Sequence, residues 1–575
     1  MTAKPPRLDS APGRETLVVI ALTLVGAVIR FWSPGRLGLI HFDEGIYALE
    51  GLWSLSPRGL AEIDPTIISY APPGFPVLVG LSYLMFGVND FAAILVSIGA
   101  GTLTIPLAAW LSWRTFGPGA GGAAAAFTAL SGPHIAFSRM ALTDASFLLF
   151  WLAAIGMGQR FLERPNPARA LLLGLAVGIS QLFKYNGWIS GAIVAASAVV
   201  WLLFHPCERR TRPMAATWGW GLFAAIVAAI VYWPWFAFVD SHGGYSALLA
   251  HQRSYLGGLS SWPGHWSLQL AQNTFLSGGA VWLVLTGVSA ALAMTISHGD
   301  LALGNRILSR VFVAALGLTA LCLIPAFTWY VPLAWIFMEI LRQGGPATKA
   351  ANLLCTGLIF LSVMTPFYHP YARLWLPIEA FGWLLMGGVF VGLRASVEVA
   401  GRGARWTWAS STDPLPWFTL SCLLAALISS KLQPGQQRLP SLGPSDSLRQ
   451  AAQTIKGELP RDVRDLNAYT RPPLAYYMAL GGSVTVHRQP DIEHLLATGN
   501  TAPWALLDLA LIRQQNTSEQ DLDRLLAGWT LVREIPTTLN PPTLLDIEPA
   551  AARGALIDAS APLRLLRRKP RETVR

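Results

Sequence analysis

Charged residues are scarce in this 575-residue sequence. Asp, Glu, Lys and Arg make up 13% of it and hydrophobic residues 53%, whereas soluble domains carry about 25% charged residues. Such a chain cannot cover itself with polar surface in water, so lipid must cover much of it. The net charge of +10 does not indicate nucleic-acid binding, because the basic residues lie in short segments between apolar runs and not in one patch.

Cysteine is also rare. The four cysteines (Cys207, Cys322, Cys355 and Cys422) form no close pair and no metal-binding spacing, and three lie in apolar runs, so we expect no disulfide framework. No small-residue cleavage site follows the first apolar run, near 17–32, so we interpret that run as a membrane helix and not as a signal peptide.

Long apolar runs, by contrast, recur from Leu17 to about Ser430. They predict a polytopic all-α membrane protein with about 13 transmembrane helices, some of them short for a crossing of ~20 residues. The expected spans are 15–32, 90–113, 119–133, 143–159, 170–183, 187–204, 215–237, 278–297, 311–326, 328–341, 351–367, 374–393 and 415–430.

The Lys and Arg residues between these runs predict the orientation. With a cytoplasmic N-terminus, the inside segments hold 17 Lys and Arg against 7 outside before the tail, in agreement with the positive-inside rule. An odd number of spans then places the C-terminus outside. Two outside loops are long, about 33–89 and 239–275. In the first, Pro72, Pro73 and Pro76 interrupt an apolar stretch, which favours interfacial helices over a further span.

The composition changes after Lys431, where a segment rich in Gln, Gly, Pro and Ser reads as a linker. We therefore expect a transmembrane domain over residues 1–432 and a small extracytoplasmic α/β domain over 433–575. Within the second domain the patterns predict helices over 445–459 and 518–526 and strands over 483–486, 530–535 and 543–547.

Acidic and basic residues gather at the predicted outer face. Asp43 and Glu44 follow the first span, and a carboxylate there can accept a proton from a hydroxyl acceptor. Asp144 opens a span, where a helix cap is the ordinary interpretation. Among the cations, Arg139, Lys184 and Arg373 can neutralise phosphate oxygens, although snorkelling or stacking on aromatic rings also accounts for Lys184 and Arg373.

Histidines in the second long loop leave a divalent metal as an open alternative. His251 and His265, with His242, lie in this loop and could bind a divalent metal. They lack the spacing that places two ligands on one helix face, so surface histidines are the favoured interpretation.

Several of these residues stand in an order that resembles glycosyltransferase family 39, which includes protein O-mannosyltransferases and the aminoarabinose transferase of lipid A. The matching motifs run over about 15–395. They are Asp43-Glu44 with Tyr47, the double proline Pro72-Pro73 leading to Phe86-Gly87, Ser138-Arg139 with Asp144, Lys184, and Arg373 before Leu376-Pro377. Where many relatives carry His or Lys before the double proline, this chain has Tyr70-Ala71.

The resemblance implies a GT-C fold and a polyprenyl-phosphate sugar as donor. It also implies inverting transfer to a hydroxyl or phosphate acceptor on a lipid, glycan or protein, at the outer face of a bacterial inner membrane. By analogy, Asp43 would act as the acid–base residue supported by Glu44 and Asp144. The donor phosphate would be held by Arg139, Lys184 and Arg373, and the substrate site would be lined by Tyr47 and Tyr70.

Two other classes remain open on the sequence. A transporter or flippase of lipid-linked sugars would be favoured by intramembrane charge pairs and by helices broken at matching places in two halves, but most charges here lie at span ends. A non-catalytic assembly protein would act through its outer tail and would not need Asp43 or Asp144.

Overall fold

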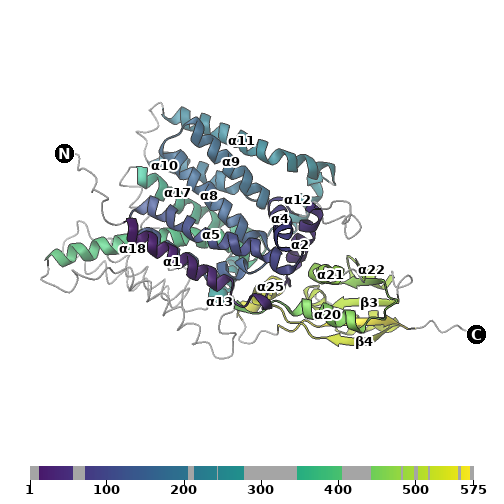
Figure 1. Cartoon of the computed structure of the whole chain (residues 1–575). Helices are drawn as coiled ribbons and strands as arrows, with labels where there is room; N and C mark the ends of the chain where they lie inside the picture. The colour runs from purple at the N-terminus through teal and green to yellow at the C-terminus, as the bar shows by residue number, and fades with distance from the viewer. Residues whose placement is uncertain are drawn as a thin grey trace, which may run out of the picture. The chain divides into compact units, whose positions relative to one another are not determined.

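The computed structural model describes residues 12–55, 71–204, 213–242, 244–277, 346–403, 442–480, 484–497, 503–515, 519–553 and 559–569. They divide into two compact units (Figure 1). One unit comprises Met1–Arg30, Gly99–Ile135 and Asp144–Leu439, and the other Phe31–Ile98, Ala136–Thr143 and Pro440–Arg575. Each unit thus joins segments that are distant in the sequence.

The first unit is helical. Its helices are α1 (Pro12–Arg30), most of α5 (Asp90–Phe116), α6 (Ala120–Leu130), most of α8 (Thr143–Glu163), α9 (Pro167–Phe183), α10 (Ile189–Phe204), α11 (Pro213–Ser241), α12 (Gly244–Arg253), α13 (Trp262–Ser277), α17 (Pro346–Met364) and α18 (Leu376–Gly403). The short helix α7 (Gly132–Ser138) crosses the division between the units. Two 3₁₀ turns, η5 (Thr365–Phe367) and η6 (Ala372–Trp375), connect α17 to α18.

Small residues allow these helices to pack closely. Helices α9 and α11 lie side by side (Figure 1), and a Cβ atom at Gly174 of α9 would lie 2.4 Å from the Ala224 carbonyl oxygen of α11. A Cβ at Gly387 of α18 would lie 2.5 Å from the Ala120 carbonyl oxygen of α6. Packing through small residues is common where lipid removes the hydrophobic drive between helices.

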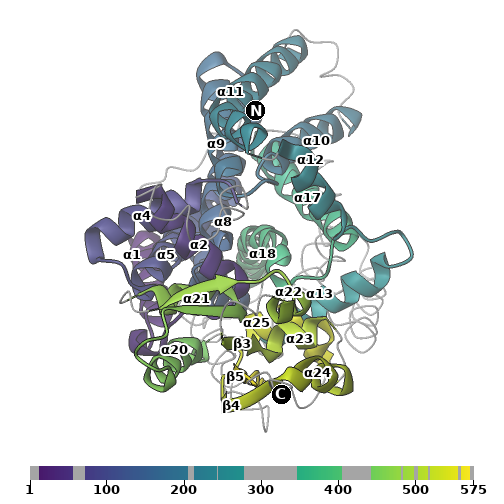
Figure 2. The same ribbon diagram turned by 90° about the vertical axis from the view of Figure 1, so that its right-hand side faces the viewer.

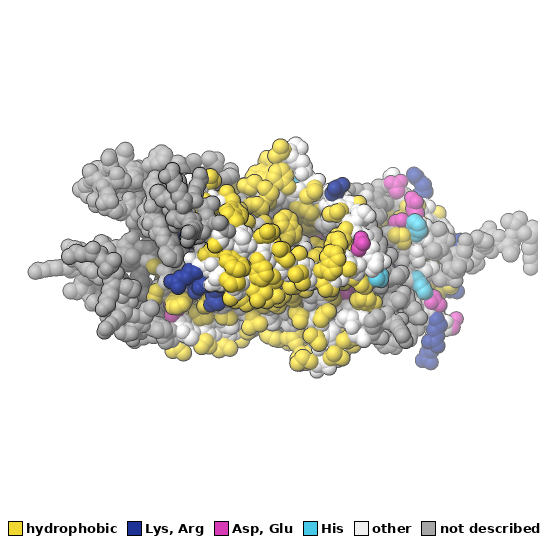
Figure 3. Space-filling view, turned by 90° about the horizontal axis from the view of Figure 1, so that it is seen from above, with side chains coloured by type: hydrophobic (Ala, Val, Ile, Leu, Met, Phe, Trp, Pro, Cys, Tyr) yellow, Lys and Arg dark blue, Asp and Glu magenta, His cyan; other side chains and the backbone are white. Residues whose placement is uncertain are grey.

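The surfaces of these helices are apolar. Among the described residues, four segments are long and apolar enough to cross a membrane: Asp90–Phe116, Thr143–Glu163, Ala216–Ser241 and Lys349–Phe367. Figure 3 shows a face of the helices that hydrophobic side chains dominate. Exposed Leu222, Ile226, Ile230 and Trp233 on α11 would meet water in a soluble protein and suit a lipid environment.

The sequence located most of these helices. The expected spans from 15–32 through 215–237, and those at 351–367 and 374–393, all coincide with helices. The expected spans 278–297, 311–326, 328–341 and 415–430 lie outside the described residues, so the count of about 13 stays a prediction, as does the domain boundary at 432/433. Cys355 is the one described cysteine, and it is buried with a free thiol.

The second unit contains the long first loop and the C-terminal residues. The loop folds as a 3₁₀ turn, η1 (Pro34–Arg36), and the short helices α2 (Phe42–Leu55) and α4 (Gly74–Phe86). These two helices pack on each other, with a Cβ at Gly51 predicted to lie 2.5 Å from Val79. At 14 and 13 residues, both are too short to cross a bilayer upright, and the expected position of the proline-containing stretch at the membrane interface stays a prediction.

The C-terminal residues form a five-stranded sheet of order β2-β1-β3-β5-β4. Its strands are β1 (Asp465–Tyr469), β2 (Thr485–Arg488), β3 (Trp504–Asp508), β4 (Trp529–Ile535) and β5 (Leu563–Arg568). Strand β1 pairs in parallel with β2 and β3, whereas β5 pairs antiparallel with β3 and β4. The helices of this part are α20 (Ser447–Glu458), α21 (Pro472–Ala479), α22 (Ile492–Ala497), α23 (Leu509–Gln514), α24 (Glu519–Leu525) and α25 (Pro541–Ile547), placed around the sheet in Figure 2.

One strand prediction for this domain, over residues 543–547, is wrong. Residues 543–547 belong to helix α25, because the Asn540 side chain accepts a hydrogen bond from the Thr543 N–H and Pro541 and Pro542 occupy the first helical positions. Both features start helices. The helix over 445–459 and the strand over 530–535 are confirmed as α20 and β4, the helix over 518–526 as α24, and the strand over 483–486 lies two residues later as β2.

Candidate functional site

The acidic pair lies in the first turn of α2. Asp43 is buried, 6% exposed, and its backbone N–H donates to Nδ1 of His41 at 3.1 Å. A carboxylate in this position is favoured by the partial positive charge of a helix N-terminus. The preceding segment 37–40 is buried as well, so the chain presents Asp43 from a fixed turn and not from a mobile loop.

Glu44 beside it is fully buried and acts as a triple hydrogen-bond acceptor. Its Oε2 accepts from the N–H groups of Ile40 and His41, both at 2.8 Å, and its Oε1 accepts from the N–H of Ala141, also at 2.8 Å. Burial raises the pKa of Glu44, and the three backbone donors oppose that rise. The carboxylate thereby joins α2 to the loop that carries Arg139.

A third acid, Glu50, was missed in the sequence. It is buried on α2, and burial raises its pKa well above the ordinary value, with a further rise from the charge of Asp43. Glu50 follows Asp43 by seven residues, which is two helical turns, so the two share a helix face. That spacing was the signal available in the sequence.

Arg139 lies in the loop between α7 and α8, within the same unit. Its Nη1 donates to the carbonyl oxygen of Trp32 at 2.7 Å, and burial lowers its pKa to about 10. The end of the loop is tied by a 3.0 Å hydrogen bond from Ser97 Oγ to the Leu142 carbonyl. Arg139 therefore keeps its charge at neutral pH, and its side chain is held by the Trp32 carbonyl.

Asp144 and Lys184 form an ion pair in the helical unit. Lys184 Nζ lies 2.6 Å from Asp144 Oδ1, with the carboxylate 3% and the lysine 24% exposed. The other carboxylate oxygen, Oδ2, has no hydrogen-bond partner. Lys184 also sits over the Phe147 ring at 5.7 Å. Asp144, predicted as a helix cap, and Lys184, predicted to bind phosphate, thus contact each other although they are 40 residues apart in the sequence.

An apolar groove of about 700 Å³ runs along α9, α10 and α11 in this unit. Leu173, Val177 and Trp233 line it, and so do Gln181 near the end of α9 and Trp188 just before α10. Its size falls within the ~300–1,000 Å³ that small-molecule sites occupy, and its walls suit a hydrocarbon chain.

Arg373 lies in η6, near a group of aromatic rings and histidines. Its guanidinium stacks 5.1 Å from the centre of the Tyr371 ring, which is the stacking anticipated from the sequence. The segment after α12 pairs with residues 367–369, which precede this turn, through hydrogen bonds from Gly257 N–H to the Phe367 carbonyl at 2.7 Å and from His369 N–H to the Tyr255 carbonyl at 2.8 Å.

The two candidate metal ligands do not come together with others. His251 stacks edge-on against Tyr255, and His265 Nδ1 lies 3.1 Å from the Pro366 carbonyl oxygen. Within the described ranges, no group of three His, Cys, Asp or Glu side chains has the geometry to hold a metal ion. Of the proposed lining residues, Tyr47 is buried with its ring edge against Phe75, and Tyr70 lies outside the described residues.

The structure therefore gathers the predicted residues in two sets. Asp43, Glu44, Tyr47 and Arg139 belong to the unit that contains the C-terminal sheet, whereas Asp144, Lys184 and Arg373 belong to the helical unit.

Comparison with known proteins gives a match to a family model described as dolichyl-phosphate-mannose-protein mannosyltransferase, over residues 70–235. No curated protein sequence matches this chain. ArnT from Cupriavidus metallidurans, in a structure bound to undecaprenyl phosphate, is 14% identical with a TM-score of 0.50, covering 96% of this chain and 98% of ArnT. The oligosaccharyltransferase of Archaeoglobus fulgidus is 13% identical with a TM-score of 0.47, covering 87% and 70%.

The family match confirms the resemblance to glycosyltransferase family 39 over residues 70–235, and the similarity to ArnT, which spans almost the whole of both chains, confirms the GT-C fold.

Proposed function

We propose that this chain is an inverting, integral-membrane glycosyltransferase that takes its sugar from a polyprenyl-phosphate donor. The observation that carries the proposal is the apolar groove along α9, α10 and α11, whose lining includes Gln181 and Trp188, the residues three before and four after Lys184. A groove lined by hydrocarbon side chains fits an isoprenoid tail, and a lysine close to its lining in sequence, paired with Asp144, fits the phosphate to which that tail is joined. ArnT was solved with a ligand of this class.

In the proposed reaction, an acceptor hydroxyl attacks the anomeric carbon of the donor sugar. The bond between that carbon and the phosphate oxygen breaks, the acceptor proton passes to the Asp43 carboxylate, and polyprenyl phosphate leaves. The cations Arg139, Lys184 and Arg373 stabilise the charge that develops on the departing phosphate. These roles rest on the sequence motifs, with Glu44 and Asp144 as supporting acids.

We further propose that the reaction takes place at the outer face of a bacterial inner membrane. The excess of Lys and Arg in the segments predicted to lie inside supports this orientation. The acceptor would be a hydroxyl or phosphate group on a lipid, glycan or protein.

The test is turnover by the purified protein. The protein is mixed with a panel of polyprenyl-phosphate sugars and a membrane-lipid extract, and donor consumption is followed by mass spectrometry for wild type and Asp43→Asn. Consumption of one donor, lost in Asp43→Asn while the variant stays folded, supports the transferase and identifies its sugar. A folded wild type that consumes no donor contradicts the proposal and favours the transporter alternative, which flux across reconstituted vesicles would then test.

A further inference from the structure

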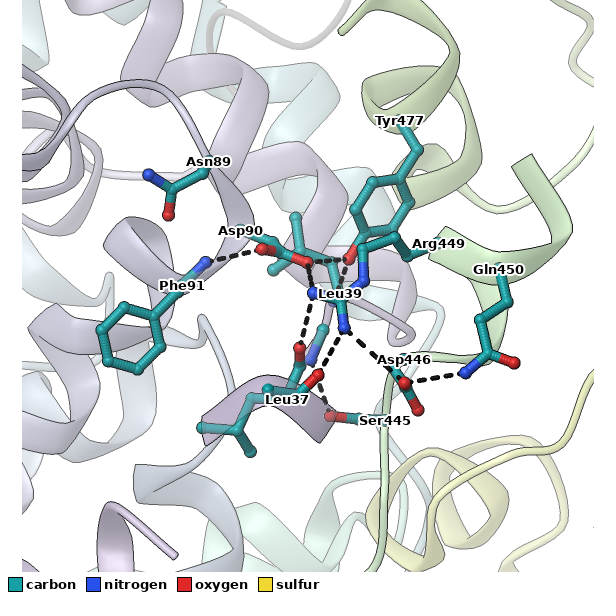
Figure 4. Close-up of polar contacts among 12 residues, drawn as sticks. Leu37, Leu39, Asn89, Asp90, Phe91, Ser445, Asp446, Arg449, Gln450 and Tyr477 are labelled. Atoms are coloured by element: carbon teal, nitrogen blue, oxygen red, sulfur yellow. Dashed lines mark hydrogen bonds and ion pairs between the residues drawn. The ribbon is translucent and has the colours of Figure 1, made fainter. Parts of the chain in front are cut away.

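The backbone that leads into α2 is held by side chains of the C-terminal residues. Arg449 on α20 donates to the carbonyl oxygens of Gly35 at 2.7 Å and Leu37 at 3.2 Å. Ser445 binds the same segment twice, through its N–H to the Arg36 carbonyl and through its Oγ to the Gly38 N–H, both at 3.0 Å. Figure 4 shows Arg449 and Ser445 beside Leu37.

A buried polar cluster extends this attachment. The Leu39 N–H donates to the Tyr477 hydroxyl at 2.7 Å, and this hydroxyl donates to Asp90 at 2.8 Å. Asp90 also accepts a hydrogen bond from Arg449 Nη1 at 2.8 Å, so this one carboxylate orients the side chains of both Tyr477 and Arg449 (Figure 4). Asp90 and Tyr477 are both buried, and a buried network in which every member is bonded is rigid.

Residues 40–45 are held by Arg471 and Asp508, which lie just after β1 and at the end of β3, and by helix α21. Arg471 donates to the Ile40 carbonyl at 3.2 Å, and Asp508 orients it through a fully buried ion pair of 2.7 Å. Helix α21 also lies against α2, because a Cβ at Gly45 would come within 2.2 Å of the Pro473 backbone nitrogen. Phe42 packs into the core of the sheet domain.

The last link reaches His41, two residues before Asp43. His41 Nε2 lies 2.8 Å from Asp546 Oδ2 on α25, and both side chains are under a tenth exposed. Because the Asp43 N–H donates to His41 Nδ1, that nitrogen carries no proton, and Nε2 is the nitrogen that donates to Asp546. A chain of two hydrogen bonds thus runs from α25 to the backbone of Asp43.

From these contacts we infer that the C-terminal domain positions the Asp43 carboxylate, with Asp546 and His41 as the positioning residues. The inference rests on the proposed function of Asp43. The domain supplies bonding partners along residues 35–41, and a misplacement of about 1 Å at a reacting group can lower a rate by roughly 10²-fold. The tail would therefore set the rate of transfer without contacting the donor.

The experiment compares Asp546→Ala and His41→Asn with the matched control Asp465→Ala. Asn at position 41 keeps an acceptor for the Asp43 N–H but is too short to reach Asp546. Asp465 forms a 2.7 Å pair with His487 on the exposed surface of the same domain. Each full-length protein is assayed for kcat and KM with the donor that wild type consumes, and hydrogen exchange is measured on peptides covering 37–47.

We expect kcat to fall at least tenfold in both test variants while the donor KM stays within about twofold, because positioning acts on the transition state and not on donor binding. The Asp546→Ala/His41→Asn double variant should be no slower than the slower single variant, since both break one link. Exchange over 37–47 should accelerate in these proteins and stay unchanged in Asp465→Ala.

Unchanged kcat in variants whose exchange has accelerated would overturn the inference, as would unchanged exchange. So would a loss of activity that tracks only the folded fraction, with kcat per folded molecule equal to wild type. These results differ from failure of the proposed function, which would appear as absence of donor turnover by wild type.

Discussion

Replacing Glu44 by Gln separates a chemical role of this residue from a structural one. The carboxylate accepts three backbone N–H groups, all at 2.8 Å, and Gln offers only one acceptor oxygen. If the amide oxygen faces Ile40 and His41, the amide NH₂ group must face the N–H of Ala141, so that bond is lost. Hydrogen bonds to a charged acceptor contribute about 1.5–3 kcal/mol each, and the two bonds that remain weaken with the loss of charge.

Removing a buried charge offsets part of that loss, because burial already raises the pKa of Glu44. We therefore expect Glu44→Gln to lower the free energy of unfolding by about 2 kcal/mol. The loop of Arg139 should lose protection at Ala141 before the rest of the unit, because that bond is the one given up.

The assay is unfolding of the purified protein in mixed micelles, together with hydrogen exchange over 136–144. Glu493→Gln, the same substitution at an exposed position of α22, is the matched control and should leave both measurements unchanged. A Glu44→Gln protein that is as stable as wild type, with unaltered exchange at Ala141, would refute the reasoning. Wild-type stability with lost turnover would instead favour the role in catalysis, in support of Asp43, that the resemblance implies for Glu44.

Two further predictions concern buried charges. Lys184→Met leaves the buried Asp144 carboxylate without its 2.6 Å partner and should destabilise the protein by roughly 3 kcal/mol. Adding Asp144→Asn should restore most of that stability without restoring donor turnover, and recovered turnover would contradict a phosphate-binding role for Lys184. For Glu50, the folded-state pKa lies well above the reference value of 4.5, so folding takes up a proton and stability falls as pH rises from about 4.5 toward the folded-state pKa. Glu50→Gln should flatten this decline above about pH 4.5 by up to about 1.4 kcal/mol per pH unit, and an unchanged slope in thermal melts above that pH would contradict the assignment.

The sequence predicted the helical part of the fold well, because a membrane span can be recognised from a continuous apolar run alone, without information about the helices that pack against it. The C-terminal sheet was harder to predict. Strands β1, β3 and β5 were not foreseen, since each is five or six residues long and β3 is buried throughout, so none shows the alternation that identifies a strand. Residues 543–547 were predicted as a strand from their apolar content, although Asn540 and the two prolines after it were readable as a helix start.

The residues of the candidate site could likewise be predicted only in part. Asp43, Arg139, Lys184 and Arg373 could be selected because a charge near an apolar run stands out in a sequence. Their partners could not be selected, because pairs such as Lys184 with Asp144 or His41 with Asp546 are separated by 40 and 505 residues and nothing local connects them.

The position of the tail follows from the same physics. The segment 37–41 is irregular and buried, and buried backbone N–H and C=O groups must find hydrogen-bond partners. A helix or strand would supply them internally, but a turn that must present a carboxylate at the start of α2 cannot. Arg449, Ser445, Tyr477 and Arg471 supply them instead. The side chains of the C-terminal residues therefore complete the hydrogen bonding of the segment that leads into Asp43.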